Sequence, residues 1–118
     1  MIGRITFSGR LTEDQLIGEL ATCRAVCFPP FQEDYGFVTV EAFASRKAVI
    51  TCRDSGGPAE LVKDGVNGFV CEPTPEAIGR AMRRLVDDAT LAERMGTAAF
   101  EAGAKLTWPE TVRQLVLQ

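Results

Sequence analysis

Short apolar runs alternate with amphipathic segments along most of the chain. The apolar runs at 25–28 and 48–51 predict short buried strands, the run at 69–71 predicts an edge strand, and the alternating segment 4–8 predicts a further strand. Strands that alternate with helices are typical of a parallel sheet with helices on its faces. We therefore expect an α/β fold with a Rossmann-like parallel sheet of about four short strands.

Capping residues and helical spacing mark the helices between these strands. Thr12 and Gln15 have the spacing of a capping box, as do Thr107 and Glu110 near the end of the chain. Thr74 precedes a proline and an apolar face with helical spacing, which is a strong start signal. The expected helices begin near residues 13, 36, 59, 75, 89 and 107.

Composition limits the size and the environment of the protein. A chain of 118 residues that is 46% hydrophobic supports one domain, which we take to be 1–118. The net charge of -3 gives no reason to expect nucleic acid or an anionic membrane as partner. No apolar run approaches the roughly 18 residues of a transmembrane helix, and acids in the first twenty residues argue against a signal peptide. We expect a cytoplasmic protein whose four widely spaced cysteines are free thiols.

The residue types restrict the chemistry. The chain contains no histidine, which removes the usual proton shuttle near neutral pH and the commonest metal ligand. Catalysis would have to use carboxylates, backbone dipoles or the substrate itself, and we expect neither a metal nor a cofactor.

Two loops that follow strands carry candidate binding residues. In a parallel α/β sheet, ligands bind outside the carboxyl ends of the strands. Glu33 and Gly36 precede an expected helix start, and Glu41 lies about one turn inside that helix, so both acids could face a ligand at its positive end. Gly56 and Gly57 form a turn after the next strand. Each feature alone has a structural explanation, since acids often complement a helix dipole and paired glycines often only make a turn.

Taken together, these loops resemble a known family. The segment 29–42, PPFQEDYGFVTVEA, is similar to the E-x7-E signature of retaining GT-B glycosyltransferases, especially those of family four. Glu33 and Glu41 stand at its two glutamate positions. Segments 4–9, 48–51, 56–62 and 67–70 resemble successive parts of the same donor-binding domain in the same order. The likeness thus spans nearly the whole chain.

The resemblance implies a donor site for a nucleotide diphosphate sugar, such as a UDP- or GDP-hexose. Glu41 would bind the ribose hydroxyls, and Glu33 would act catalytically beside the transferred sugar. Backbone N–H groups of Gly36, Phe37 and Val38 would meet the diphosphate or sugar without a metal. Gly56 and Gly57 would belong to the glycine-rich segment of the same site. Transfer would retain the anomeric configuration, as expected of a hexosyltransferase of this family.

The chain lacks parts that the family usually has. It contains no amino-terminal acceptor domain and none of the early strands that supply an Arg and a Lys to the diphosphate, so we expect only the C-terminal donor part of such an enzyme. The family also often has serine, glycine and proline where Pro30, Arg46 and Ala48 stand.

The missing strands affect the expected sheet. In the order 3-2-1-4-5-6, the segments 4–8, 25–28, 48–51 and 69–71 would be strands three to six. The absence of strands one and two would expose an edge, which predicts either that segment 4–8 moves beside segment 25–28 or, as we favour, that two chains form a homodimer.

Two other interpretations remain. The chain could be a non-catalytic module, derived from a glycosyltransferase, that binds a nucleotide or a protein. Alternatively, Glu33 and Glu41 could be ordinary surface acids of an α/β domain. The retained glutamates favour a donor site, whereas the missing basic residues and acceptor domain favour the non-catalytic module.

Overall fold

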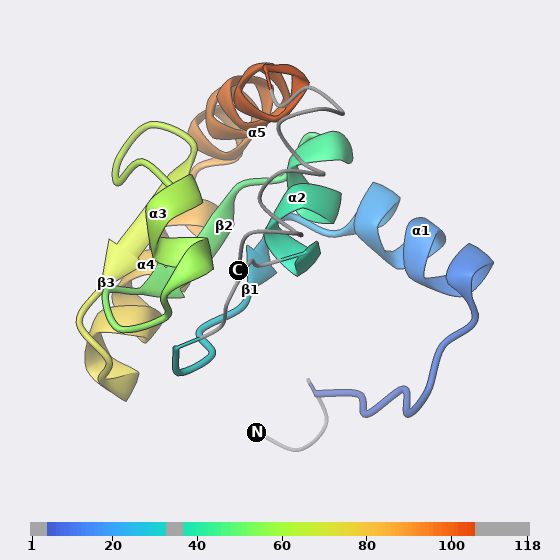
Figure 1. Ribbon diagram of the computed structural model, residues 1–118, viewed down its shortest axis with the longest axis horizontal. Helices are drawn as coiled ribbons and strands as arrows, with labels where there is room; N and C mark the ends of the chain where they lie inside the picture. Colours follow the sequence, from blue (N-terminus) through green and yellow to red (C-terminus); the bar gives the residue numbers. More distant parts are fainter. Residues whose placement is uncertain (1–4, 33–36, 106–118) are drawn as a thin grey trace, which may run out of the picture.

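A three-stranded parallel sheet lies at the centre of the molecule. The computed structural model describes residues 5–32 and 37–105. Its strands are β1 (Val26–Cys27), β2 (Val49–Cys52) and β3 (Gly68–Cys71), which lie side by side in chain order (Figure 1). Val26 pairs with Val49, and Ile50 pairs with Phe69. All four residues of the central strand β2 are buried. The predicted order of these three strands and the edge position of the last are therefore confirmed.

Five helices accompany the sheet within residues 5–32 and 37–105. They are α1 (Glu13–Thr22), α2 (Phe37–Ala44), α3 (Gly57–Leu61), α4 (Pro75–Asp87) and α5 (Ala89–Ala104). Each follows a predicted helix signal. The capping box is present in both directions, with Thr12 N–H donating to Gln15 Oε1 at 2.9 Å and Gln15 N–H donating to Thr12 Oγ1 at 3.2 Å. The expected helix from 107 lies outside the described residues.

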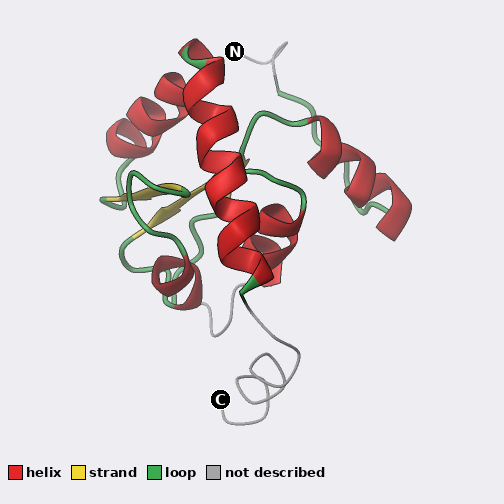
Figure 2. Ribbon diagram, turned by 90° about the horizontal axis from the view of Figure 1, so that it is seen from above, coloured by secondary structure: helices red, strands yellow, loops and turns green. Residues whose placement is uncertain are grey.

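The two faces of β2 contact different helices. Ile50 packs in a cluster with Leu85 of α4 and Met95 of α5, while Val49 packs with Phe43 of α2 and Ala99 of α5. The sheet therefore lies between α4 and α2, and α5 contributes to the cores on both faces. Figure 2 shows α5 running across the molecule and α1 standing to one side, away from the sheet.

The prediction of a strand at 4–8 is wrong for residues 5–8, which the structure describes. Residues 5–8 form no strand, and Ile5 and Phe7 are 60% and 94% exposed. A strand is stable only when a neighbour accepts its backbone hydrogen bonds, and segment 5–8 has not moved beside β1. Within the described residues the sheet thus has three strands rather than about four.

The turn between α2 and β2 holds a non-glycine residue in a left-handed conformation. Arg46 has φ 60°, and the N–H groups of Arg46 and Lys47 donate to the carbonyls of Phe43 and Ala42, as in a Schellman motif. Glycine usually occupies this position. The Arg46 guanidinium lies 4.1 Å from the centroid of the Phe100 ring, a cation–π contact that offsets part of the conformational cost.

All four cysteines are free, as predicted. Among the described residues, no helix is long and apolar enough to cross a bilayer.

Candidate functional site

Hydrogen bonds join the loops after β1 and β2 at the carboxyl end of the sheet. The backbone N–H of Gln32 donates to the carbonyl of Asp54 at 3.0 Å. Beneath this contact, the fully buried Thr51 hydroxyl donates to the Phe28 carbonyl at 2.8 Å and shares a 2.9 Å hydrogen bond with the Ser55 hydroxyl. Buried hydroxyls paired in this way fix the backbone around them. The sequence predicted these two loops as neighbours, but not the Thr51 side chain that connects them.

The glycine turn after β2 is determined by backbone geometry. Gly56 is the N-cap of α3 with φ 78°, a conformation that strains any residue with a Cβ atom. Gly57, the first residue of α3, is buried. Both predicted binding residues therefore lie at the carboxyl edge of the sheet. The positive φ at Gly56 therefore explains why a glycine stands at this position, whether or not a ligand binds there.

The start of α2 approaches the same edge. Phe37 and Val38 form its first turn, and their side chains are 51% and 36% exposed. Because α2 follows β1 and α3 follows β2 in a parallel sheet, both helix starts lie at the carboxyl ends of the strands. The positive end of α2 thus points to this edge. Glu33 and Gly36, which we predicted as site residues, lie outside the described residues.

Glu41 lies one turn further along α2 and faces a cavity. The cavity measures about 530 Å³ and lies between α1 and α2, where Thr12, Leu16, Leu20 and Ser45 also line it. Glu41 itself is exposed. The sequence predicted α1 from its capping box, but it gave no signal that α1 would form a wall beside this glutamate.

Two polar groups near the edge were missed by the sequence analysis. Thr39, in the first turn of α2, is fully buried, and its hydroxyl has no hydrogen-bond partner among the described residues. Arg53 directly follows β2, and its Nε donates to Glu72 Oε2 at 2.6 Å. The Glu72 carboxylate raises the pKa of Arg53, which keeps the guanidinium charged. Since both partners are largely exposed, solvent screens this pair, and an anionic ligand could compete for Arg53.

The thiols near the edge are poor nucleophiles. Burial raises the pKa of Cys52, and the charges of Asp54 and Glu72 raise it further. Burial likewise raises the pKa of Cys71. Both thiols stay protonated near neutral pH, so the described chemistry favours binding by backbone dipoles, carboxylates and a guanidinium over attack by a thiolate.

Solved structures share this arrangement of strands and helices. A sucrose-phosphate synthase from Thermosynechococcus elongatus superposes with a TM-score of 0.84 over 98% of this chain and 29% of its own, at 25% identity. The Anabaena protein HepE, solved in complex with UDP, superposes with a TM-score of 0.77 over 98% of this chain and 32% of its own, at 27% identity. The fold is therefore that of GT-B glycosyltransferases, as the resemblance implied.

Sequence comparison gives the same result. The human alpha-1,3/1,6-mannosyltransferase ALG2 is 34% identical over 94 residues, which are 80% of this chain and 22% of that enzyme. The chain thus spans about a fifth of the length of this relative. The profile of the family described as glycosyl transferases group 1 matches residues 2–102. The chain belongs to the glycosyl transferases group 1 family.

Proposed function

We propose that the chain binds a nucleotide diphosphate sugar and supplies the donor half of a retaining hexosyltransferase with an unknown acceptor. The observation that carries this proposal is the convergence of the α2 start and the Gly56 turn at the carboxyl edge of a sheet with the family's fold. HepE, whose structural match covers 98% of this chain, is solved with UDP. We favour a UDP- or GDP-hexose as donor for this chain.

The proposal assigns a role to each predicted residue. Backbone N–H groups of Gly36, Phe37 and Val38 bind the diphosphate with the dipole of α2, which offsets its charge without a metal. Glu41 accepts hydrogen bonds from the ribose hydroxyls, and its exposure leaves the carboxylate accessible to them. Glu33 acts catalytically beside the sugar.

The glycine turn completes the proposed donor site. Gly56 and Gly57 let the loop approach the ligand closely, because neither has a side chain. Arg53 adds a cation at the same edge.

The cytoplasmic location stays a prediction.

Replacing Glu41 with alanine tests the donor site. We expect the wild-type chain to bind either UDP or GDP and its hexose conjugate, and Glu41→Ala to bind about ten- to a hundredfold more weakly, because hydrogen bonds to a carboxylate are lost. Calorimetric titration measures both affinities. Glu101→Ala, on the exposed side of α5, is the matched control and should bind like wild type.

A folded wild-type chain that binds none of these nucleotides would contradict the proposal. The non-catalytic module would then be the better interpretation. Equal affinity of Glu41→Ala and wild type would instead remove Glu41 from the site while leaving the nucleotide assignment in place.

We also propose that two chains associate through the open edge of β1. β1 pairs with β2 on one side, and no described strand covers its other side. Unpaired edges favour association. Sedimentation equilibrium should give twice the chain mass of 12.8 kDa. The N–H groups of Val26 and Phe28 donate toward β2, so the Cys27 N–H faces the open edge, and a Pro substitution at Cys27 should shift the mass toward the monomer. A monomer at all concentrations would refute the dimer.

A further inference from the structure

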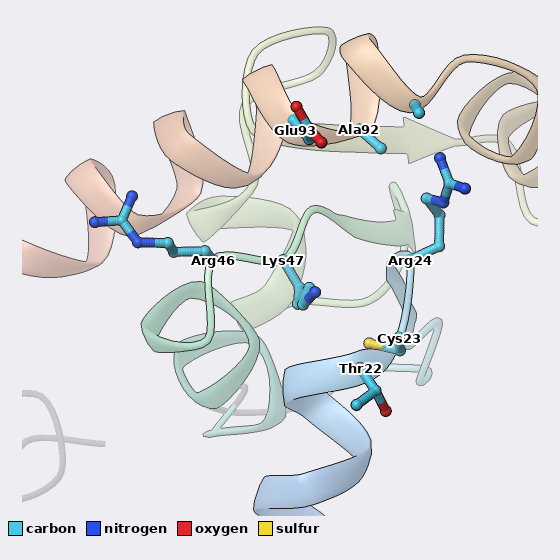
Figure 3. A pocket seen from close by; sticks show the side chains of 8 residues that line it. Thr22, Cys23, Arg24, Arg46, Lys47, Ala92 and Glu93 are labelled. Carbon is cyan, nitrogen blue, oxygen red and sulfur yellow. The ribbon is translucent and has the colours of Figure 1, made fainter.

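A second cavity lies at the opposite end of the sheet from the candidate donor site. It measures about 320 Å³. Its walls come from the junction of α1 and β1, the turn between α2 and β2, and the first turn of α5 (Figure 3). Arg24 precedes β1 and Lys47 precedes β2, so the cavity lies at the amino ends of these parallel strands. It is therefore separate from the edge at which Gly56 and Phe37 lie.

Positive charge dominates the walls. Arg24, Arg46 and Lys47 line the cavity, against the single carboxylate of Glu93. Among the residues that the structure describes, no carboxylate lies within ion-pair distance of any of these three cations. Figure 3 shows Lys47 between Arg24 and Arg46, with Glu93 on α5 across the cavity. Three cations against one carboxylate around a concave surface attract an anion from solution.

The three cations do not contribute equally. Figure 3 shows the Arg46 side chain extending away from Lys47, and its guanidinium is held over the Phe100 ring. Arg46 therefore adds charge at the rim. Lys47 lies close to Cys23, which also lines the cavity. The Lys47 charge lowers the pKa of the Cys23 thiol, although burial raises that pKa more strongly.

Ala89, the first residue of α5, brings the start of a sixteen-residue helix to the same cavity. The Asp88 carboxylate caps this helix end by accepting a hydrogen bond from the Leu91 N–H, so the helix adds little positive charge there and the three cations supply it.

We propose that this cavity binds the phosphate group of a small phosphomonoester, with Lys47 and Arg24 as its principal ligands and Arg46 at the rim. An ammonium and a guanidinium suit phosphate oxygens because their charge-assisted hydrogen bonds are about twice as strong as neutral ones. A liquid water molecule takes up about 30 Å³. The cavity thus has room for an organic group as well as the phosphate.

Amide shifts in nuclear magnetic resonance spectra would test this site directly. The folded chain is titrated with inorganic phosphate and, separately, with glycerol 3-phosphate at constant ionic strength. We expect saturable shifts at Cys23, Lys47 and Ala92, with tighter binding of the ester. Shifts at Phe37 and Gly56 would report the donor site, so the two proposals fail independently.

Variants that replace one charged side chain with glutamine distinguish a specific phosphate site from general attraction by the net charge of the protein. Lys47→Gln should weaken binding about tenfold or more, because it removes a charge-assisted hydrogen bond. Arg83→Gln makes the same charge change on an exposed part of α4 and should leave the affinity unchanged. Glu93→Gln should strengthen binding, since it removes a charge of the same sign as the ligand.

Three results would overturn the proposal. Equal weakening by Lys47→Gln and Arg83→Gln would mean that only net charge attracts phosphate. Shifts that rise without saturation at Cys23 and Lys47 would show that no site exists. Equal affinity for inorganic phosphate and the ester would overturn the assignment to a phosphomonoester and identify phosphate itself as the ligand.

Discussion

Gly96→Ala should lower the free energy of unfolding by about 2–3 kcal/mol, although alanine is normally the better helix former. Gly96 is buried in α5, where the helix crosses the turn between α2 and β2. A Cβ atom there would overlap the Arg46 carbonyl oxygen. Backbone cannot move aside as a flexible side chain can, so either the helix or the left-handed turn must shift.

Gly79→Ala is the matched control for this substitution. Gly79 is exposed in α4, and an added Cβ atom would meet nothing within 4 Å. The same change should therefore raise stability by about 0.5–1 kcal/mol through helix propensity. Urea unfolding followed by circular dichroism measures both variants. A Gly96→Ala protein as stable as Gly79→Ala would show that the contact between α5 and the turn is not tight in solution.

Leu85→Ala should cost about 2–5 kcal/mol, a large share of the 5–15 kcal/mol typical of a domain. Leu85 is 1% exposed and belongs to the cluster that joins Ile50 of β2 and Phe69 of β3 to α4 and α5. Its truncation leaves a cavity against the sheet. The midpoint of urea unfolding should fall while the slope stays unchanged.

Val86→Ala provides the comparison on the same helix. Val86 is 65% exposed, so its truncation should change stability by less than about 0.5 kcal/mol. If the two substitutions cost the same, α4 would not pack on the sheet through the face that contains Leu85.

Local signals predicted most of the elements. The reciprocal bonds of Thr12 and Gln15 and the cap at Thr74 need only residues within one turn, and they lie where the sequence placed them. The segment around Ile5 has the alternation of a strand, but a strand also needs an edge to join, and alternation does not report whether one is available. Sequence therefore predicts local geometry better than pairing.

In the candidate site, too, the sequence predicted local features but not contacts between residues far apart in the chain. Gly56 was predicted from its turn and Phe37 from the family resemblance, and the parallel sheet places both at its carboxyl edge. The link from Thr51 to the Phe28 carbonyl joins residues 23 positions apart, and the pairing of Arg53 with Glu72 depends on the adjacency of β2 and β3. Such contacts arise only after the strands pair, so no short motif announces them.

The order of the strands has a consequence for how the chain folds. Each strand pairs with the next one along the chain, as Val26 with Val49 and Val49 with Gly68. Every new strand therefore closes only one short crossover, and the entropic cost of closure grows slowly with loop length. Paired residues are therefore 23 and 19 positions apart, from 26 to 49 and from 49 to 68, which is less than a strand order that skips a neighbour would require. Smaller separations between paired residues favour faster folding. The sheet could grow strand by strand as the chain leaves the ribosome, before α5 closes over both cores.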